Sequence, residues 1–364
     1  MNHQIAHADV VNASVSSKTI WRHVVLRTDT GLTGIGEATL NSADQNFDQR
    51  LGEFASHLIG QDVFDAGAWS TQPNGHMSMA DRAMCSAASQ ALWDLRGQIR
   101  GVPVYKALRD AADAATISMY ANINRMTESR LPQEFADNAQ RAAGDGFDAV
   151  KIAPFDGVTP ENCGQGDGAE RIRVAMERIR AVSSAVPDCE VMVDCHWRLD
   201  LQTALSLLPE LAQARVTWLE SPIEERASFI DQIVTIRREA NTLGVRLAGL
   251  EQFGDLSSVR PFIEAGAFDV IMPDVKYAGS LEGIVEIADE ATRFDTAVSL
   301  HNPSGPVAHL FSAHVMAAIG GDERMELQWG ESAAFFELTD PAPVIAGGSC
   351  RPSTGAGLGA VYQS

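Results

Sequence analysis

Eight short apolar runs between residues 117 and 329 constrain the fold of this chain more than any other feature. Between them lie stretches whose apolar residues recur every three or four positions, as in residues 169–185, 201–214 and 281–294. This spacing is typical of amphipathic helices, and strands that alternate with helices form a parallel sheet. Eight such units predict an α/β fold, a (β/α)8-type barrel over residues 117–330. The runs are "ISMYANI", "DAVKIAPF", "EVMVDCH", "VTWLES", "RLAGLEQ", "FDVIMPD", "AVSLHNP" and "MELQW".

The first 116 residues break this rhythm. "TIWRHVVLRTDTGLTGIGEATL" (19–40) predicts a hairpin and a strand, and helical patterns follow near residues 45–60 and 79–98. The glycine order G-x-x-G-x-G differs from the dinucleotide-binding fingerprint, so we interpret it as turn chemistry. The tail, 331–364, is too rich in glycine for a ninth unit. We therefore expect an α+β domain over 1–116, the barrel over 117–330, and a segment over 331–364 that returns to the first domain.

Composition narrows the possible partners and the compartment. The formal net charge is −20 with no cluster of Lys and Arg, which argues against nucleic acid and anionic membranes as partners. Five cysteines, odd in number and without a CxxC pair, suit reduced thiols in the cytosol. The N-terminus lacks the pattern of an export signal, and no apolar run approaches the roughly 18 residues that span a bilayer. We expect a soluble, cytoplasmic protein.

Polar residues end five consecutive apolar runs, the third to the seventh. They are Asp194, Glu220, Glu251, Asp274 and His301. Active sites of parallel barrels form at the C-terminal ends of the strands. A single such residue would more often be a helix cap or a hydrogen-bonded core group. Five in succession instead predict one shared site.

The residue types at these run ends suggest the chemistry of that site. Three carboxylates on adjacent strands would repel one another unless a cation lay among them. All-oxygen ligation favours Mg²⁺, with Mn²⁺ as a possible substitute. Asp274 and His301 on neighbouring strands could form a dyad in which the carboxylate fixes the tautomer of the imidazole. His196 follows Asp194 by two positions, so strand alternation predicts that both side chains face one cavity.

At this point the residues resemble the enolase superfamily, and within it the mandelate-racemase-like branch. "GLTGIGEA" (31–38) resembles its N-terminal sheet motif, and "ALWDLRGQIRGVPVYKALR" (91–109) resembles the helix and linker that lead to its barrel. The resemblance covers nearly the whole chain and implies that the N-terminal domain caps the barrel mouth. It also implies homo-oligomeric assembly. The implied site residues are the metal ligands Asp194, Glu220 and Glu251, the dyad of Asp274 and His301, and Glu326 as the glutamate that assists an enediolate, with Glu331 as a weaker candidate.

Two details narrow the branch. In "VKIAPF" (150–155) the family's first lysine is present as Lys151, but Ala153 stands where a second lysine often lies. The loss of one base argues against racemisation by two bases. "DCHWR" (194–198) is similar to the galactonate and mannonate dehydratases, in whose galactonate-type members the histidine protonates a departing hydroxyl. The resemblance therefore implies that His196 is a general acid.

These features together lead us to expect a Mg²⁺-dependent hydro-lyase that converts an aldonate or aldarate through an enediolate to a 2-keto-3-deoxy acid. Two alternatives stay open: a racemase, epimerase or cycloisomerase that uses Lys276, and a barrel that binds metal and a carboxylate ligand without turnover. The sequence does not name the sugar acid. Expected substrate contacts are Lys151, Asn122 with Asn124, Lys18, and the loops 12–23 (with Trp21 and Arg22) and 41–46.

Overall fold

Eight parallel strands make up most of the ten-stranded main sheet of the computed structural model, which describes residues 3–16, 19–40, 46–67 and 77–363. Their spatial order is β11-β4-β5-β6-β7-β8-β9-β10. A backbone hydrogen bond from Glu326 to the Leu300 carbonyl (3.2 Å) links β11 to the segment that follows β10, where no paired ladder forms. The strands are β4 (Ile117–Asn122), β5 (Ala149–Ile152), β6 (Glu190–Asp194), β7 (Val216–Glu220), β8 (Arg246–Gly249), β9 (Val270–Ile271), β10 (Ala297–Val298) and β11 (Met325–Gln328).

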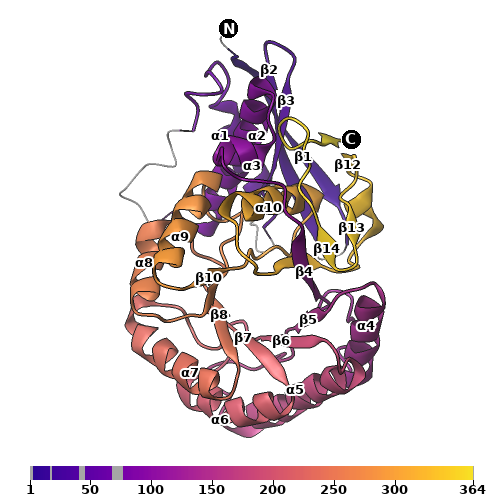
Figure 1. Cartoon of the computed structure of the whole chain (residues 1–364), viewed down its shortest axis with the longest axis vertical. Helices are drawn as coiled ribbons and strands as arrows, with labels where there is room; N and C mark the ends of the chain where they lie inside the picture. The colour runs from indigo at the N-terminus through magenta and orange to yellow at the C-terminus, as the bar shows by residue number, and fades with distance from the viewer. Residues whose placement is uncertain (1–2, 17–18, 41–45, 68–76, 364) are drawn as a thin grey trace.

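Helices follow these strands and surround them in Figure 1. The helical patterns predicted over 169–185, 201–214 and 281–294 are confirmed as α5, α6 and α9. The side chains of Asp200, Asp255 and Ser280 accept backbone hydrogen bonds at the starts of α6, α8 and α9, which explains where these helices begin. The helices are α4 (Pro132–Gly144), α5 (Gly166–Ala185), α6 (Leu201–Gln213), α7 (Ile230–Thr242), α8 (Leu256–Glu264), α9 (Leu281–Arg293) and α10 (Pro306–Ile319).

Strand alternation divides the inside of the sheet into an apolar layer and a polar layer. The apolar layer is a buried cluster that includes Tyr120, Met192 and Trp218. Side chains two residues further along a strand point the same way. On β4 to β7 those next residues are polar and buried: Asn122, Lys151, Asp194 and Glu220. A charged layer thus lies at the C-terminal ends of the strands, where the sequence predicted the site.

The N-terminal part is an antiparallel sheet covered by helices. β1 (Ile5–Ser14), which the sequence analysis did not assign, pairs with β2 (Ile20–Thr28), and β2 pairs with β3 (Thr33–Glu37). The other elements are α1 (Phe47–Ser56), α2 (Met79–Arg100) and α3 (Val104–Leu108). α2 packs so closely on β3 that a Cβ atom at Gly36 would lie 1.9 Å from the Ala87 carbonyl oxygen. The glycines of "GLTGIGE" therefore allow a close helix–sheet contact as well as a turn.

The C-terminal segment contacts both parts of the molecule. β14 (Ser349–Cys350) forms a hairpin with β13 (Ile345–Ala346) and pairs with the start of β4. β12 (Thr339–Asp340) pairs with β15 (Val361–Tyr362). The Leu358 amide donates to Asp94 of α2 at 2.9 Å, and Figure 1 shows both termini at the same end of the molecule. The domain boundaries at residues 116 and 330 stay predictions. Within the described ranges, no helix is long and apolar enough to cross a bilayer.

Glu37, at the end of β3, connects the N-terminal sheet to the barrel. Its carboxylate is fully buried and accepts backbone hydrogen bonds from Gly305 and Ala308, both at 2.9 Å, at the start of α10. A helix N-terminus favours a negative charge because its amide groups lack partners within the helix. Glu37 therefore anchors the segment that links His301 to α10.

Replacement of Glu37 by Ala should lower the free energy of unfolding by about 3 kcal/mol, because two buried charge-assisted hydrogen bonds disappear. The matched control is Glu264→Ala at an exposed position on α8, which should change stability by less than about 0.5 kcal/mol. Urea denaturation of the three proteins measures both effects. Equal stability of the Glu37 variant and the unmodified chain would contradict this anchoring role.

Candidate active site

Three buried carboxylates converge at the C-terminal ends of adjacent strands. Asp194 and Glu220 are the last residues of β6 and β7, and Glu251 lies two residues after β8. One oxygen from each lies within 4.8 Å of the others. These are the three ligands that the sequence predicted, and the structure brings them together. Such an all-carboxylate donor set suits a hard divalent cation.

Lys151 of β5 provides a buried positive charge beside this cluster. Its Nζ lies 2.9 Å from both carboxylate oxygens of Glu220 and 3.1 Å from Oε1 of Glu326. Burial lowers the pKa of Lys151, but the charges of Glu220 and Glu326 outweigh burial and raise the pKa well above its ordinary value. Lys151 therefore stays protonated.

The side chains of Asp274 and His301 lie within hydrogen-bonding distance, as the predicted dyad requires. His301 Nδ1 lies 2.7 Å from Asp274 Oδ2, and its Nε2 lies 3.2 Å from Glu251 Oε2. Burial lowers the pKa of His301, but Glu251, Glu326 and Asp274 outweigh it and raise the pKa to about 9. Because Asp274 occupies Nδ1, the ring directs Nε2 towards the carboxylate cluster.

His196 reaches the site by a different route from the one predicted. β6 ends at Asp194, and His196 and Trp197 adopt left-handed backbone conformations with φ of 48° and 56°. The position of the His196 side chain is therefore set by a tight turn after β6, and not by the alternation of side chains along the strand. The turn brings Nε2 to 2.8 Å from Asp194 Oδ2, while the His196 amide donates to Oδ1 at 2.8 Å. Asp194 and His196 both line one cavity.

Left-handed residues also flank two of the predicted ligands. Ser221, directly after Glu220, has φ of 44°, and Leu250, directly before Glu251, has φ of 71°. A residue other than glycine in such a conformation costs about 1–3 kcal/mol and persists only where its surroundings enforce it. The ligand-bearing turns are therefore strained and depend on the contacts around them.

Glu326 of β11 lies among hydrogen-bond donors. Its Oε1 accepts from the Asn122 amide group at 2.6 Å, and its Oε2 accepts from the backbone of Asn302 at 3.0 Å. Burial raises the pKa of Glu326, but Lys151 and His301 outweigh it and lower the pKa below its ordinary value. Glu326 is therefore an ionised acceptor, and Asn122, predicted to contact substrate, is oriented by it.

Lys276 is held by two buried neighbours. Its Nζ lies 2.6 Å from Asp274 Oδ2 and also donates to Ser304 Oγ. Asp274 Oδ2 thus contacts both Lys276 and His301. Among the described residues, Asp274 is the carboxylate with which Lys276 forms an ion pair.

The remaining predicted contacts lie at the junction with the N-terminal domain. Glu331 accepts from Thr19 Oγ1 at 2.6 Å and pairs with Arg125 at 2.5 Å, so it joins the two parts instead of facing the carboxylates. Trp21 is buried against Gly305, and Arg22 pairs with Asp48. Lys18 and residues 41–45 lie outside the described residues.

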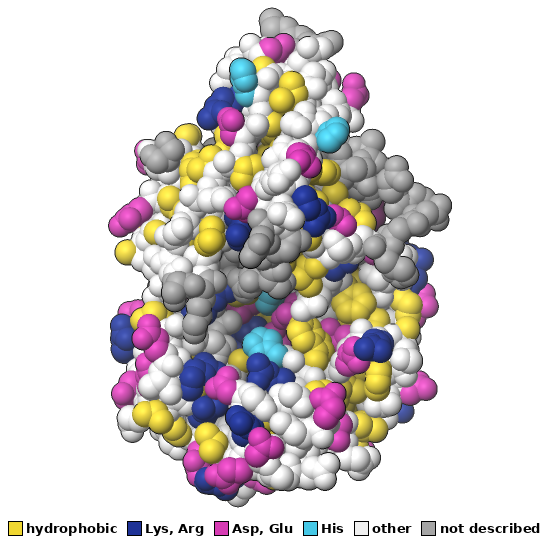
Figure 2. Space-filling view, turned by 180° about the vertical axis from the view of Figure 1, so that it is seen from behind, with side chains coloured by type: hydrophobic (Ala, Val, Ile, Leu, Met, Phe, Trp, Pro, Cys, Tyr) yellow, Lys and Arg dark blue, Asp and Glu magenta, His cyan; other side chains and the backbone are white. Residues whose placement is uncertain are grey.

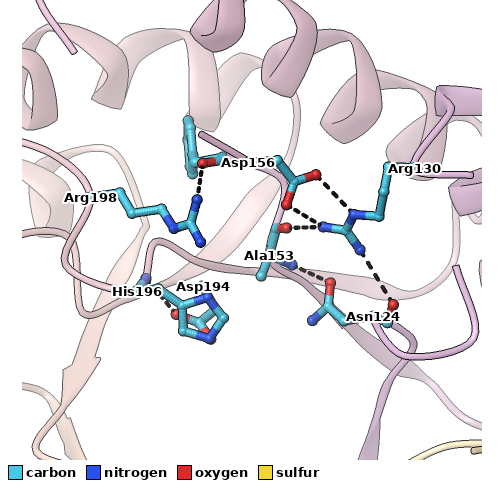
Figure 3. Close-up of a pocket in the computed structure, with 8 residues that line it drawn as sticks. Asn124, Arg130, Ala153, Asp156, Asp194, His196 and Arg198 are labelled. Atoms are coloured by element: carbon cyan, nitrogen blue, oxygen red, sulfur yellow. Dashed lines mark hydrogen bonds and ion pairs between the residues drawn. The ribbon is translucent and has the colours of Figure 1, made fainter. Parts of the chain in front are cut away.

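A cavity of about 130 Å³ opens beside His196. Figure 3 shows the His196 ring against Asp194, with Arg198 and Ala153 on the cavity walls. Ala153 lines this space, so a lysine here would project into it. Arg198 donates to the Phe155 carbonyl at 2.7 Å. In Figure 2, acidic, basic and histidine side chains surround a hollow on this face of the molecule.

Sequence reasoning missed Arg130 and Asp156, which also line this cavity. Arg130 Nε lies 2.8 Å from Asp156 Oδ2, and Arg178 binds the same carboxylate oxygen at 2.8 Å. Both residues of the first pair lie in loops outside the apolar runs. No periodic signal in the sequence marks such positions.

In the metal-free protein, Asp194→Asn should lower the pKa of His196 from about 9 towards its ordinary value near 6.5. The charge of Asp194 is the largest cause of the raised pKa, because a nearby carboxylate stabilises the imidazolium. His301, which responds mainly to other carboxylates, should keep its pKa near 9 and serves as the internal control. NMR titration of the imidazole C–H signals measures both pKa values. An unchanged pKa of His196 would contradict its close contact with Asp194.

Comparisons with known proteins agree with this architecture. The chain is 26% identical over 351 residues to the D-galactonate dehydratase of Ralstonia pickettii, covering 93% of this chain and 88% of that protein. It is 28% identical over 365 residues to the D-xylonate dehydratase of Haloferax volcanii, covering 96% of this chain and 85% of that protein. Among solved structures, an enolase superfamily member from Salmonella Typhimurium superposes with a TM-score of 0.85 at 21% identity, covering 99% of this chain and 96% of that one. The structure of a mandelate racemase/muconate lactonizing enzyme from Sulfitobacter sp. superposes with a TM-score of 0.86 at 21% identity, covering 99% of this chain and 93% of that one.

Family models divide the chain in two. Residues 4–108 match the N-terminal domain of the mandelate racemase/muconate lactonizing enzyme family. Residues 134–363 match the enolase C-terminal domain-like family, whose span includes the three carboxylates and both histidines of the site. The chain therefore belongs to the mandelate racemase/muconate lactonizing enzyme group of the enolase superfamily.

Proposed function

We propose that this protein is a Mg²⁺-dependent dehydratase of a sugar acid. The observation that carries the proposal is the convergence of three buried carboxylates with two histidines, one of them backed by Asp274. Two relatives named as dehydratases of sugar acids, D-galactonate and D-xylonate, support the reaction class. The product is a 2-keto-3-deoxy acid, and the substrate is an aldonate or aldarate.

Asp194, Glu220 and Glu251 would hold the cation, which is Mg²⁺ or its substitute Mn²⁺. When bound, it supplies a fixed double positive charge that stabilises negative charge on the substrate carboxylate. Lys151 contributes a second fixed cation at the same carboxylate. Lys151 is suited to this role because Glu220 and Glu326 keep it protonated and hold its Nζ between them.

His301 is the base that removes the proton from the carbon next to the substrate carboxylate. Its hydrogen bond to Asp274 keeps the proton-accepting Nε2 directed into the site. The electron pair released forms an enediolate, whose charge Lys151 stabilises. The lowered pKa of Glu326 disfavours its protonated form, so Glu326 interacts with the enediolate through a water molecule and mainly orients Lys151 and Asn122.

His196 is the acid that protonates the β-hydroxyl as the carbon–oxygen bond breaks. Water leaves, and the resulting enol tautomerises to the keto acid. The His196 side chain is 43% exposed and borders the cavity of Figure 3, which gives a substrate hydroxyl room to approach it. His196 follows β6 and His301 follows β10, the third and seventh strands. Strands three and seven are opposite in an eight-stranded ring, so we expect anti elimination.

Two observations favour dehydration over epimerisation or cycloisomerisation. Ala153 stands where a second base would be needed, and Lys276 is committed to Asp274 and Ser304. A barrel that binds metal and ligand without turnover is disfavoured because acid, base and carboxylate groups are all present in one site.

The direct test is a panel of aldonates and aldarates incubated with the protein and Mg²⁺. We expect a 2-keto-3-deoxy acid from at least one of them, detected as its semicarbazone and by NMR. Proton exchange next to the carboxylate without keto product would favour the epimerase alternative. No exchange and no product with any member would favour the non-catalytic barrel.

Two histidine variants should separate the steps. His196→Asn should reduce dehydration at least 100-fold, because general acid catalysis contributes about 10²–10⁴-fold, while proton exchange with deuterated solvent continues. His301→Asn should abolish both exchange and dehydration. Proton NMR in D₂O with an active substrate follows both reactions. Unchanged turnover in His196→Asn, or syn stereochemistry in the product, would contradict the pairing of acid and base.

A further inference from the structure

Glu225 is a buried carboxylate that the proposed reaction does not use. It lies between β7 and the short helix η2 (Ala227–Phe229), five residues after Glu220, and only 8% of it is exposed. Its Oε1 accepts a hydrogen bond from Ser221 Oγ at 3.0 Å and another from the Leu250 backbone amide at 3.1 Å. One oxygen atom therefore connects two loops that are far apart in sequence.

These two loops carry two of the proposed metal ligands. Ser221 directly follows Glu220, and Leu250 directly precedes Glu251. Both residues have the left-handed backbone described above. Such conformations need external contacts to persist, and Glu225 provides one to each loop. The separation between Glu220 and Glu251 thus depends on a shared contact at Glu225.

The backbone around Glu225 is shaped to receive it. A Cβ atom on Gly249, the last residue of β8, would lie 2.1 Å from Glu225 Oε1. The carboxylate therefore lies directly against the backbone of Gly249, where a larger residue would displace it. Any other residue at 249 would separate Glu225 from Leu250.

The same connection extends to the turn that carries His196. The Trp197 amide donates to the Ser221 carbonyl at 2.7 Å, and the Cys195 amide donates to the Glu220 carbonyl at 2.9 Å. Ser221 therefore links Glu225, through its side chain, to the His196 turn, through its backbone. A displacement of Ser221 would change the position of Glu220 and of this turn together.

We propose that Glu225 is a positioning residue that fixes Glu220 and Glu251 at the separation a divalent cation requires. The inference rests on the metal site proposed above, but not on dehydration itself. Glu225 acts through the hydrogen bonds that its Oε1 accepts. A residue that keeps this acceptor should preserve metal binding, and a residue of similar size without it should not.

Substitution of Glu225 by glutamine or by methionine distinguishes the effect of its hydrogen-bond acceptor from the effect of its side-chain volume. Glu225→Gln keeps an amide oxygen that can accept from Ser221 and Leu250. Burial raises the pKa of Glu225 to about 8, so the neutral glutamine also matches its charge at neutral pH. Glu225→Met keeps the length of the side chain and removes the acceptor.

The experiment titrates Mn²⁺ into the metal-free full-length proteins and measures free Mn²⁺ by electron paramagnetic resonance. Loss of a group that orients a ligand typically weakens metal binding about 10–100-fold. We expect this loss for Glu225→Met and a change of less than about threefold for Glu225→Gln. Thermal unfolding of the metal-free variants first establishes that each is folded at the temperature of the titration.

A purely structural role for Glu225 would lower the unfolding temperature of Glu225→Met and leave the Mn²⁺ affinity of the folded protein unchanged. That result would overturn the inference, as would equal losses for the Gln and Met variants. If Glu225→Met does not fold, Ser221→Ala decides: removing this donor should weaken Mn²⁺ binding severalfold, and unchanged affinity would overturn the inference.

The failure of the proposed site is distinguishable from the failure of this inference. An unmodified chain that binds no Mn²⁺ would contradict the metal site and the inference together. An unmodified chain that binds Mn²⁺ but dehydrates no sugar acid would contradict the dehydratase function alone. In that case the comparison of the Gln and Met variants still tests Glu225.

Discussion

Mutual repulsion among buried carboxylates is the constraint on which the rest of this site depends. If all five were ionised beside two protonated lysines, three negative charges would remain without compensation in a poorly solvated space. Burial and the neighbouring carboxylates relieve one of them, because they raise the pKa of Glu220 to about 8 in the metal-free protein. Protonation of His196 and His301 would balance the other two, in agreement with pKa values of about 9 for both imidazoles. A divalent cation beside neutral imidazoles would balance the same two charges. The five carboxylates belong to Asp194, Glu220, Glu251, Asp274 and Glu326, and the lysines are Lys151 and Lys276.

Two imidazole protons and one divalent cation would thus balance the same negative charge, and this links metal binding to the proposed catalysis. A histidine that carries an extra proton cannot act as a base, so the raised pKa of His301 in the metal-free state opposes its proposed role. A cation bound by Asp194, Glu220 and Glu251 removes the negative charge that stabilises that proton. Binding of the proposed cation would therefore be coupled to release of the proton from the proposed base, through the charges that the strand ends bring together.

The fold produces this charge density through simple strand geometry. Along β4 to β7, alternating side chains form an apolar layer and, two residues further on, a polar layer. Because the strands are parallel, the polar layer lies at their C-terminal ends, on one edge of the sheet. The N-terminal domain is attached to the same edge through Glu37, which binds the start of α10 just after His301. The C-terminal segment strengthens the join by pairing with β4 and by binding Asp94.

Sequence periodicity was sufficient for the barrel and for groups that end strands. Asp194, Glu220, Glu251, Asp274 and His301 could be found because apolar runs end in parallel register. The geometry of His196 could not, since it depends on a left-handed turn that β-propensity does not encode. β1 was missed because its half-exposed residues carry little apolar signal.

Contacts between loops were beyond the reach of the sequence as well. Glu225 contacts Leu250 across 25 residues, and Arg130 contacts Asp156 across 26. Glu331 was a weaker candidate for the site, and in the structure its partners are Thr19 and Arg125. Such pairings depend on how loops meet in space, and residue spacing along one chain carries no record of them.

The most direct test of this account is calorimetric titration of the metal-free protein with Mg²⁺ at pH 7.5 in two buffers of different ionisation enthalpy. Ligand and base groups must lose protons when a cation binds, so the apparent enthalpy should depend on the buffer. We expect one Mg²⁺ to bind per chain, with net release of protons. Absence of binding, or binding with the same enthalpy in both buffers, would contradict it.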